Sequence, residues 1–216
     1  MKKWTQTIIL FDLDGTLTDS AEGVIRSLQH MQEKMGTEKW AATDLTFAVG
    51  PPLMKTFRED FGMDAETAER ALSVFRERYT TVGLFENKLY PGIEEMLQSL
   101  QKKGKRMAVA TSKKEETAVR ILEHFGIAKY FEIIGGDNRA AGRDDKAKVI
   151  AYVLEQMQAK QGNVVMVGDR KFDIEGAHAI GIPCIAVEYG YGDRAEFEAH
   201  GADCIAATAA EVAELF

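Results

Sequence analysis

Two aspartates, Asp12 and Asp14, stand one residue apart directly after a short apolar run, in the stretch IILFDLDGTLTD at residues 8–19. In an extended segment, side chains two positions apart point to the same side of the chain. One carboxylate could therefore attack an electrophile while the other transfers protons. Unpaired carboxylates are costly to bury, so the pattern predicts positively charged partners nearby.

Gly15 and Thr16 follow as turn residues. Glycine adopts backbone conformations that other residues avoid, and the N–H groups of such a turn can face a bound anion. The segment thus combines a candidate nucleophile, a candidate proton donor and a candidate phosphate-binding turn. A D-x-D pattern after a strand is by itself a weak indicator of chemistry, so its value depends on the rest of the chain.

The elements that must position these residues alternate along the chain. Short apolar runs rich in Val, Ile and Ala have the length of buried parallel strands. They lie at residues 7–11, 106–111, 131–134, 163–167 and 182–187. Helical patterns separate them at residues 91–103, 115–125, 145–160 and 173–180. This alternation predicts an α/β fold with a Rossmann-like parallel sheet and helices on both faces.

Polar residues follow these runs where the strands are expected to end. In an open parallel sheet, ligands bind beyond the carboxyl ends of the strands. The residues expected at this edge carry oxygen or ammonium groups: Asp12, Asp14, Thr111, Ser112, Asp137, Lys146 and Asp169. Crowded carboxylates repel each other unless a cation lies among them, and hard oxygen ligands suit Mg²⁺. The sequence therefore predicts a magnesium site at this edge.

Residues 20–82 interrupt the alternation, because they carry helical patterns and no convincing strand. The helices are expected at residues 20–35, from Pro51 and Pro52 to Gly62, and from an Asp64 cap to Gly83. A helical block inserted after the first strand indicates a separate lobe. We expect a core of residues 1–18 and 84–216 and an all-helical domain of residues 19–83.

Composition restricts the classes of function. The 216 residues carry a net charge of −7, which argues against a broad nucleic-acid or lipid-head-group surface. No apolar stretch approaches the roughly 20 residues that cross a bilayer, and the first apolar run ends at Asp12, short of signal-peptide length. Cys184 and Cys204 lack the spacing of a metal site, so reduced thiols are expected. A cytoplasmic protein without membrane or nucleic-acid partners is predicted.

The order of these motifs resembles that of the haloacid dehalogenase (HAD) superfamily phosphatases, and the resemblance covers the whole chain. The four superfamily motifs are matched by DLDGT at 12–16, ATS at 110–112, Lys146 and GDRKFD at 168–173. Other stretches resemble the phosphoglycolate phosphatase-like branch, which includes relatives assigned as 5′-nucleotidases: DLDGTLTDS at 12–20, VGPPL at 49–53, VGDRKFDIEGA at 167–177 and YGYG at 189–192. Members of this branch carry a helical cap after the first strand, which the helical block fits.

The resemblance implies Mg²⁺-dependent hydrolysis of a small phosphomonoester. Asp12 would be the nucleophile that forms an aspartyl-phosphate, and Asp14 the general acid and later the base. Mg²⁺ would be held by the Asp12 and Asp169 carboxylates and the Asp14 backbone carbonyl. Asp173 would steady the metal ligands or Lys146, although an aspartate at this place is also an ordinary helix cap.

The phosphate contacts follow from the same resemblance. Thr111 and Lys146 would hold the non-bridging oxygens, and Lys148, which lies further into the helix, is the alternative to Lys146. Further candidates for substrate binding are Gly15, Thr16, Ser112 and Lys113. YGYG is interpreted as a rim loop rather than a contact.

A cap would exclude water during attack and open for product release, with hinges expected at residues 16–19 and 83–90. The candidates for recognising the leaving group are Val49–Leu53, Lys55 and Arg58. For the two basic residues, the alternative is a position on a solvated helix face.

The residues leave several reactions open. A sugar-phosphate mutase, an inorganic pyrophosphatase and a non-catalytic phosphate sensor are alternatives to the phosphatase. A receiver-type signalling domain also gathers Asp, Thr and Lys, but it lacks the D-x-D-G-T step and the inserted lobe. We expect the partner to be a small phosphorylated metabolite, such as phosphoglycolate or a nucleoside monophosphate, and the chain to be a monomer or homodimer.

Overall fold

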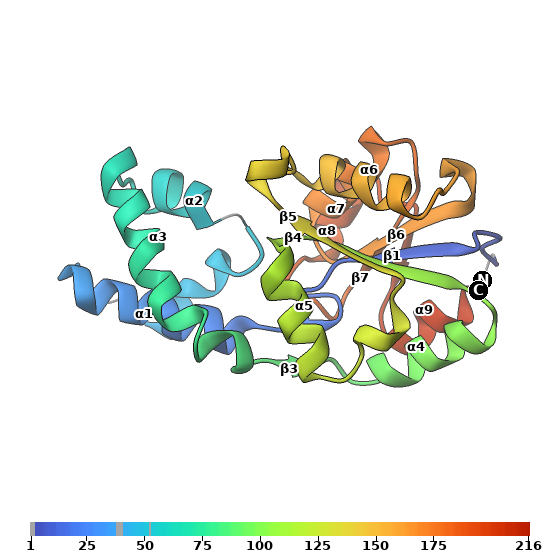
Figure 1. The fold of residues 1–216 in the computed structure, drawn as a ribbon, viewed down its shortest axis with the longest axis horizontal. Coiled ribbons are helices and arrows are strands. Elements are labelled where there is room, and N and C mark those ends of the chain that lie inside the picture. The colour runs from blue at the N-terminus through green and yellow to red at the C-terminus, as the bar shows by residue number, and fades with distance from the viewer. Residues whose placement is uncertain (1–2, 38–40, 52) are drawn as a thin grey trace. The chain divides into compact units, whose positions relative to one another are not determined.

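The protein folds into two compact units (Figure 1). The structure, a computed structural model, describes residues 3–37, 41–51 and 53–216. The larger unit combines the chain up to Thr18 with Leu89–Phe216, and the smaller unit is Asp19–Lys88. The chain passes between them through two short paired strands, β2 (Thr18–Asp19) and β3 (Lys88–Leu89).

A six-stranded parallel sheet forms the centre of the larger unit. Its strands, in the spatial order β5-β4-β1-β6-β7-β8, are β1 (Ile8–Phe11), β4 (Arg106–Lys114), β5 (Ile133–Asp137), β6 (Val164–Gly168), β7 (Cys184–Val187) and β8 (Cys204–Ala206). β1 pairs with β4 and β6, so that Ile9 lies opposite Met107 and Val165. Every residue of β1 and β6 is buried, as expected for parallel strands that are covered on both faces.

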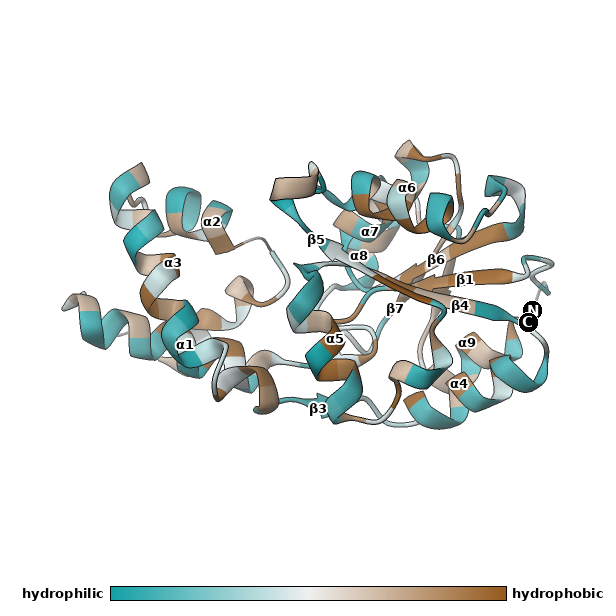
Figure 2. Ribbon diagram, in the orientation of Figure 1, coloured by the Kyte–Doolittle hydropathy of each residue, from teal (hydrophilic) through white to brown (hydrophobic). Residues whose placement is uncertain are grey.

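Helices cover both faces of this sheet. They are α4 (Ile93–Lys102), α5 (Glu115–His124), α6 (Lys146–Gln156), α7 (Lys171–Ala179), α8 (Arg194–Ala199) and α9 (Ala209–Glu214). Figure 1 shows α6 and α7 along one face and α4 and α9 along the other, and Figure 2 shows the hydrophobic strands between them. Short 3₁₀ turns occupy Ala128–Tyr130, Arg139–Ala141 and Gln161–Asn163. The predicted α/β fold with a Rossmann-like parallel sheet is confirmed.

Alternate strand residues pack against α6 and α7. Leu10 of β1 and Met166 of β6 join Val149 and Val153 of α6 in one buried cluster, to which α7 adds Ile174. Each such side chain, fully removed from water, contributes about 1.5–3 kcal/mol to folding. This packing fixes α6 and α7 on the sheet, and therefore also the residues at the start of each helix.

The smaller unit is helical. It contains α1 (Ala21–Met35), the 3₁₀ helix η1 (Ala42–Ala48), α2 (Leu53–Lys55), the π-helical segment η2 (Thr56–Asp60), α3 (Ala65–Tyr79) and η3 (Gly83–Phe85). α1 buries Val24, Leu28 and Met31, and α3 buries Ala68, Leu72 and Phe75. Asp64 caps α3, as predicted, by accepting the Thr67 N–H at 2.7 Å.

Two helix predictions for this unit were wrong in detail. The helix expected to end at Gly62 is one α turn followed by the π-helical segment, and the helix expected to reach Gly83 ends at Tyr79. The smaller unit also continues to Lys88 instead of ending at residue 83, because Glu86 accepts the Gly23 N–H and binds Arg78. Pro52, within the expected 49–53 motif, lies outside the described residues.

Within the described part of the chain, no helix has the length and apolar character needed to cross a membrane.

Candidate active site

Asp12 comes directly after β1, and its N–H donates to the Val167 carbonyl at 2.9 Å, which continues the pairing of β1 with β6 by one residue. Its side chain lies beside Lys146, the first residue of α6. Lys146 Nζ is 3.0 Å from Asp12 Oδ1 and 2.6 Å from Asp173 Oδ1, and it donates to the Ala110 carbonyl at 3.1 Å. The ammonium thus donates one hydrogen bond to a backbone carbonyl and forms ion pairs with two carboxylates.

Burial and charge act in opposite directions on this ion cluster. Burial raises the pKa of Asp12 to about 6, against the lowering effects of the Lys146 ammonium and a hydrogen bond with Thr111. Burial lowers the pKa of Lys146, but the Asp12 and Asp173 carboxylates outweigh it and hold that pKa above its usual value. Lys146 is therefore a permanently charged group inside the site.

Asp169 follows the end of β6 and is fully buried. Its Oδ1 accepts the Thr16 hydroxyl at 3.1 Å, and its Oδ2 accepts the Tyr191 N–H at 2.8 Å. Burial raises the pKa of Asp169 well above its usual value, and the nearby Asp173 and Asp12 carboxylates raise it further. Two neutral donors hold this carboxylate in place while its surroundings oppose its charge.

Three carboxylates meet closely enough to hold a cation. Each of Asp12, Asp169 and Asp173 offers one oxygen, and these three oxygens lie within 4.8 Å of one another. Lys146 supplies a single positive charge next to them. Apart from these ion pairs, Asp12 Oδ1 and Asp173 Oδ1 are buried without a hydrogen-bond partner among the residues that the structure describes, and hard oxygen donors of this kind fit Mg²⁺. The residues present therefore fit a divalent cation.

Glycines make room for Asp169. Gly15 has a φ of +83°, and a Cβ on it would overlap the Asp169 carboxylate. A Cβ on Gly190 would overlap the Asp169 Cβ and the Gly15 carbonyl. Both positions are therefore restricted by close approach, and Gly15 is restricted by its backbone conformation as well.

The Asp14 carboxylate pairs with Lys113 rather than with Lys146. Its Oδ2 lies 2.6 Å from Lys113 Nζ, and its Oδ1 is buried with no hydrogen-bond partner among the residues that the structure describes. The Asp14 carboxylate is not part of the group of three that could hold a cation. This is compatible with the expected metal contact, which was assigned to its backbone carbonyl.

The remaining predicted residues divide into two groups. Thr111 is buried, and its Oγ1 accepts the Lys113 N–H at 3.2 Å. Asp173 combines both expected roles, since its Oδ2 accepts the Arg170 N–H at 3.1 Å in the first turn of α7 while its Oδ1 meets Lys146. Ser112 is exposed, and Asp137 does not join the three carboxylates.

The two candidate lysines differ in burial. Lys146 is buried among carboxylates, whereas the Lys148 side chain is 54% exposed and pairs with Asp144 and Asp145. Lys146 is accordingly the lysine that the fold brings into the site. In the helical unit, the Lys55 side chain is 53% exposed, 3.7 Å from Glu59, as expected for a solvated helix face.

The YGYG loop, which was interpreted as a rim loop rather than a contact, supports two residues of the site. The Tyr191 N–H holds Asp169, and the Tyr189 hydroxyl donates to the Thr16 carbonyl at 3.1 Å. The Tyr189 ring packs on Tyr90 with 5.1 Å between centroids. The signal in the sequence is the pair of glycines in this loop, because a Cβ on Gly190 or on Gly192 would overlap Asp169.

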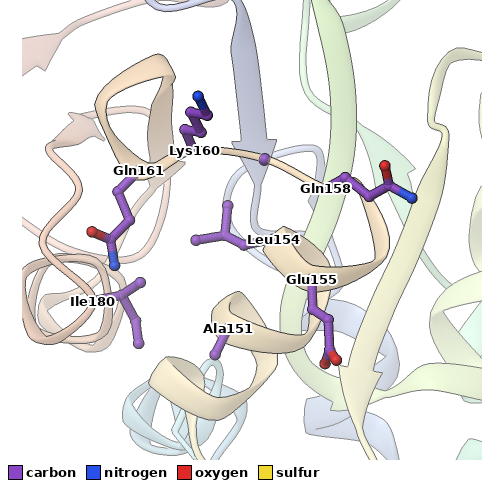
Figure 3. Close-up of a pocket in the computed structure, with 8 residues that line it drawn as sticks. Ala151, Leu154, Glu155, Gln158, Lys160, Gln161 and Ile180 are labelled. Atoms are coloured by element: carbon purple, nitrogen blue, oxygen red, sulfur yellow. The ribbon is translucent and has the colours of Figure 1, made fainter.

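A separate pocket lies at the other end of α6 (Figure 3). Leu154, Glu155 and Ile180 are among its lining residues. Lys146 begins α6 and Ala151 is the nearest residue of α6 that lines the pocket, so at about 1.5 Å per residue the pocket starts roughly 7 Å along the helix from Lys146. Its lining lacks the converging carboxylates of the candidate active site.

Known proteins are similar to the whole chain. The tyrosine-protein kinase PtkA of Mycobacterium tuberculosis is 42% identical over 208 residues, covering 96% of this chain and 70% of that protein. The 5′-nucleotidase of Pseudomonas aeruginosa is 38% identical over 192 residues, covering 89% and 87%. The crystal structure of a predicted phosphatase from Clostridium acetobutylicum matches with a TM-score of 0.93 and 39% identity over 98% of each chain.

The haloacid dehalogenase-like hydrolase family matches residues 9–187, which span the sheet from β1 to β7 and every carboxylate of the site. This match and the phosphatase and nucleotidase among the similar proteins agree with the predicted family and enzyme class. With its Asp12, Thr111, Lys146 and Asp169 gathered at the ends of parallel strands, the chain belongs to the haloacid dehalogenase-like hydrolase family.

Proposed function

We propose that this protein is a Mg²⁺-dependent phosphatase that hydrolyses a small phosphomonoester through an aspartyl-phosphate on Asp12. The observation that supports this most strongly is the buried ion cluster, in which Lys146 bridges Asp12 and Asp173 beside Asp169. A buried carboxylate with a permanently charged ammonium at hydrogen-bond distance is suited to accept a phosphoryl group, because the ammonium can hold the phosphate oxygens during transfer.

The reaction proceeds in two steps. An Asp12 oxygen attacks phosphorus, the bond to the leaving oxygen breaks, and Asp14 donates a proton to that oxygen. A water molecule then attacks phosphorus in the aspartyl-phosphate and gives a proton to Asp14, which releases phosphate and restores Asp12. Lys146 and Thr111 hold the non-bridging oxygens in both steps.

Asp12 and Asp169, with the Asp14 backbone carbonyl, would hold Mg²⁺, and Asp173 would steady these ligands. When bound, the ion supplies positive charge that reduces the repulsion between a carboxylate nucleophile and a phosphate dianion. The remaining chemistry belongs to the chain itself. Thr16 and the Tyr191 N–H orient Asp169, and Gly15 leaves the space that Asp169 needs.

The substrate is expected to be a small metabolite such as phosphoglycolate or a nucleoside monophosphate. The similarity to a 5′-nucleotidase supports the second class, and the DLDGTLTDS and VGPPL motifs support the first. We assign Asp19–Lys88 the role of a cap that excludes water during attack. We place the activity in the cytoplasm, in a monomer or homodimer.

A panel of phosphorylated metabolites tests the proposal. Purified protein with Mg²⁺ should release phosphate from at least one of them, and both EDTA and Asp12→Asn should abolish the release. Asp144→Asn, on an exposed carboxylate, is the matched control and should retain activity. Equal release by Asp12→Asn would contradict the nucleophile assignment. A phosphate retained on a sugar would favour the mutase, pyrophosphate cleavage the pyrophosphatase, and binding without turnover the sensor.

A second candidate is transfer of the phosphoryl group to a hydroxyl other than water. It is favoured by the 42% identity to a protein named as a tyrosine-protein kinase. The same aspartyl-phosphate could in principle be attacked by a phenol oxygen, with Asp14 taking the proton. Incubation with ATP and a tyrosine-containing protein distinguishes the two, because a kinase yields phosphotyrosine while a phosphatase yields only inorganic phosphate.

A further inference from the structure

Lys113 is buried at the end of β4, although lysine side chains are usually solvated. Its side chain is only 9% exposed, and its Nζ lies 2.6 Å from Asp14 Oδ2. The pairing of β4 with β5 is irregular between Ala110 and Lys114. Such irregularities redirect side chains next to active sites. Here the irregular segment contains the residue that binds Asp14.

Lys113 contacts two parts of the site at once. Its ammonium binds Asp14, and its backbone N–H donates to Thr111 Oγ1 at 3.2 Å. Thr111 in turn hydrogen-bonds Asp12. The residue proposed to transfer protons and the residue proposed to hold phosphate oxygens are therefore both fixed by one residue that belongs to neither group.

The ion pair gives the two Asp14 oxygens different roles. Oδ2 is engaged by Lys113, whereas Oδ1 is buried without a hydrogen-bond partner in the described part of the chain. An Asp14 side chain without this anchor could rotate about χ1 and χ2, and small displacements of a catalytic group can cost about 100-fold in rate. The anchor leaves Oδ1 as the oxygen that can exchange a proton with the leaving group.

We propose that Lys113 is a positioning residue that holds Asp14 in the orientation required for proton transfer to the leaving group. This inference rests on the proposed phosphatase function. The competing role is direct contact between Lys113 and the phosphate, in which case its loss would affect all substrates alike.

Substrates with different leaving groups distinguish the positioning role from direct contact with the phosphate. An alkyl phosphate needs a proton on its leaving oxygen, whereas p-nitrophenyl phosphate has a leaving group that departs without one. Lys113→Met should lower kcat on an alkyl phosphate by about tenfold or more, but kcat on p-nitrophenyl phosphate by less than about threefold, with KM little changed. Lys113→Arg, which can still bind a carboxylate, should recover much of the alkyl-phosphate activity. Lys102→Met, on an exposed lysine of α4, is the control.

Combining Lys113→Met with Asp14→Asn tests the coupling directly. If Lys113 acts through Asp14, adding Lys113→Met to the Asp14→Asn variant should lower kcat by less than about a further twofold. An equal loss on both substrates, an undiminished loss in the Asp14→Asn background, or no loss at all would each overturn the proposal. Circular dichroism of every variant checks that it is folded.

Failure of the proposed function is recognised separately, because the wild-type protein would then release no phosphate from any substrate. Crystal structures of the wild-type protein and Lys113→Met test the positioning role without activity. An Asp14 side chain that rotates or becomes disordered in Lys113→Met supports the proposal, and an unmoved Asp14 overturns it.

Discussion

Lys146 contacts three different elements. It forms ion pairs with Asp12 after β1 and Asp173 in α7, and it donates a hydrogen bond to the Ala110 carbonyl in β4. A complete buried ion pair adds little net stability, because burial of the charges offsets their attraction. Removing one partner, however, leaves the other charge buried without compensation. The ammonium should therefore matter to both the fold and the chemistry.

We predict that Lys146→Met lowers the free energy of unfolding by about 3 kcal/mol and abolishes phosphate release, because two buried carboxylates lose their cation. Urea unfolding and the phosphate assay measure the two effects. Lys148→Met is the matched control, since that lysine pairs with Asp144 and Asp145 at the surface and should change stability by less than about 1 kcal/mol. Similar losses in both variants would contradict the assignment of Lys146.

Gly15 allows a second prediction, because the cost of backbone strain and the cost of steric overlap at this position can be measured separately. Gly15→Ala should lose both stability and activity, since the added Cβ overlaps the Asp169 carboxylate and the φ of +83° strains an alanine. Gly104→Ala shares the strain, with a φ of +71°, but meets nothing within 4 Å. The strain alone should cost about 1–2 kcal/mol in each. The difference between the two variants in free energy of unfolding gives the cost of the overlap. Equal losses of stability in both variants would argue against an overlap at Gly15.

The placement of Asp12, Thr111 and Asp169 at one edge could be predicted from the sequence, because each follows an apolar run and parallel strands end at the same edge. The contacts of Lys113 and Tyr191 could not be predicted in this way, although Lys113 was a candidate for substrate binding. Lys113 reaches Asp14 from an irregular part of β4, and Tyr191 contributes a backbone N–H, which carries no sequence signature.

Among the elements, η3 and the residues after it close the helical unit. Glu86 carries this contact, since its carboxylate binds Arg26 of α1 and Arg78 of α3 at 2.8 Å and 2.6 Å. The hydrogen bond from Arg78 is the main cause that lowers the pKa of Glu86 from 4.5 to about 2, and Arg26 adds to it. One acidic side chain thus connects the two long helices of the unit.

This pKa shift makes the stability of the helical unit depend on pH. Because the folded pKa is below the unfolded one, the contribution of Glu86 is fully present above 4.5 and is lost as the pH falls toward 2. Calorimetry from about pH 6 to about pH 2.5 should show the Tm difference between wild type and Glu86→Gln shrinking with acidity. Glu77→Gln, on an exposed residue of α3, is the control, and a difference that stays constant with pH would contradict the prediction.

The elements differ in how well they could be predicted from the sequence. The central strands could be predicted because an unbroken apolar run indicates a buried parallel strand, as in β6, and the long helices because their apolar residues recur with a helical period, as in α3. β8 is three residues long, α8 and α9 are six each, and none was predicted. The π-helical Thr56–Asp60 is a single turn with one apolar residue, Phe57, so the sequence could not distinguish it from an α-helix.

For the molecule as a whole, the alternation of strands and helices was sufficient to predict the α/β core, because a parallel sheet needs helical crossovers. The boundary of the insertion was predicted less well. It depends on the contacts of Glu86 with Gly23 and Arg78, which join residues about 60 and 8 positions apart, and composition does not reveal such contacts.

The division into two units gives a last prediction about Mg²⁺. All three carboxylates that could hold the ion, Asp12, Asp169 and Asp173, belong to the larger unit. A ligand that binds only the folded state stabilises it by about 2.7 kcal/mol at 100 times its Kd. Excess Mg²⁺ should therefore raise the unfolding temperature of the larger unit and leave that of Asp19–Lys88 unchanged. Hydrogen exchange resolves the two units, with protection expected to increase in β1 and β6 but not in α1 and α3.

Asp169→Asn is the variant that connects this effect to the site. It removes one charge from the cluster. Its amide oxygen can still accept the Tyr191 N–H, and its NH2 group can donate to the Thr16 hydroxyl oxygen. The variant should fold, since the removal of a buried carboxylate whose pKa is raised relieves a cost of burial, and it should lose the Mg²⁺-dependent protection. If Mg²⁺ protected both units equally, or protected Asp169→Asn as well as the wild type, the ion would be binding elsewhere. The carboxylate cluster would then be held together by Lys146 alone.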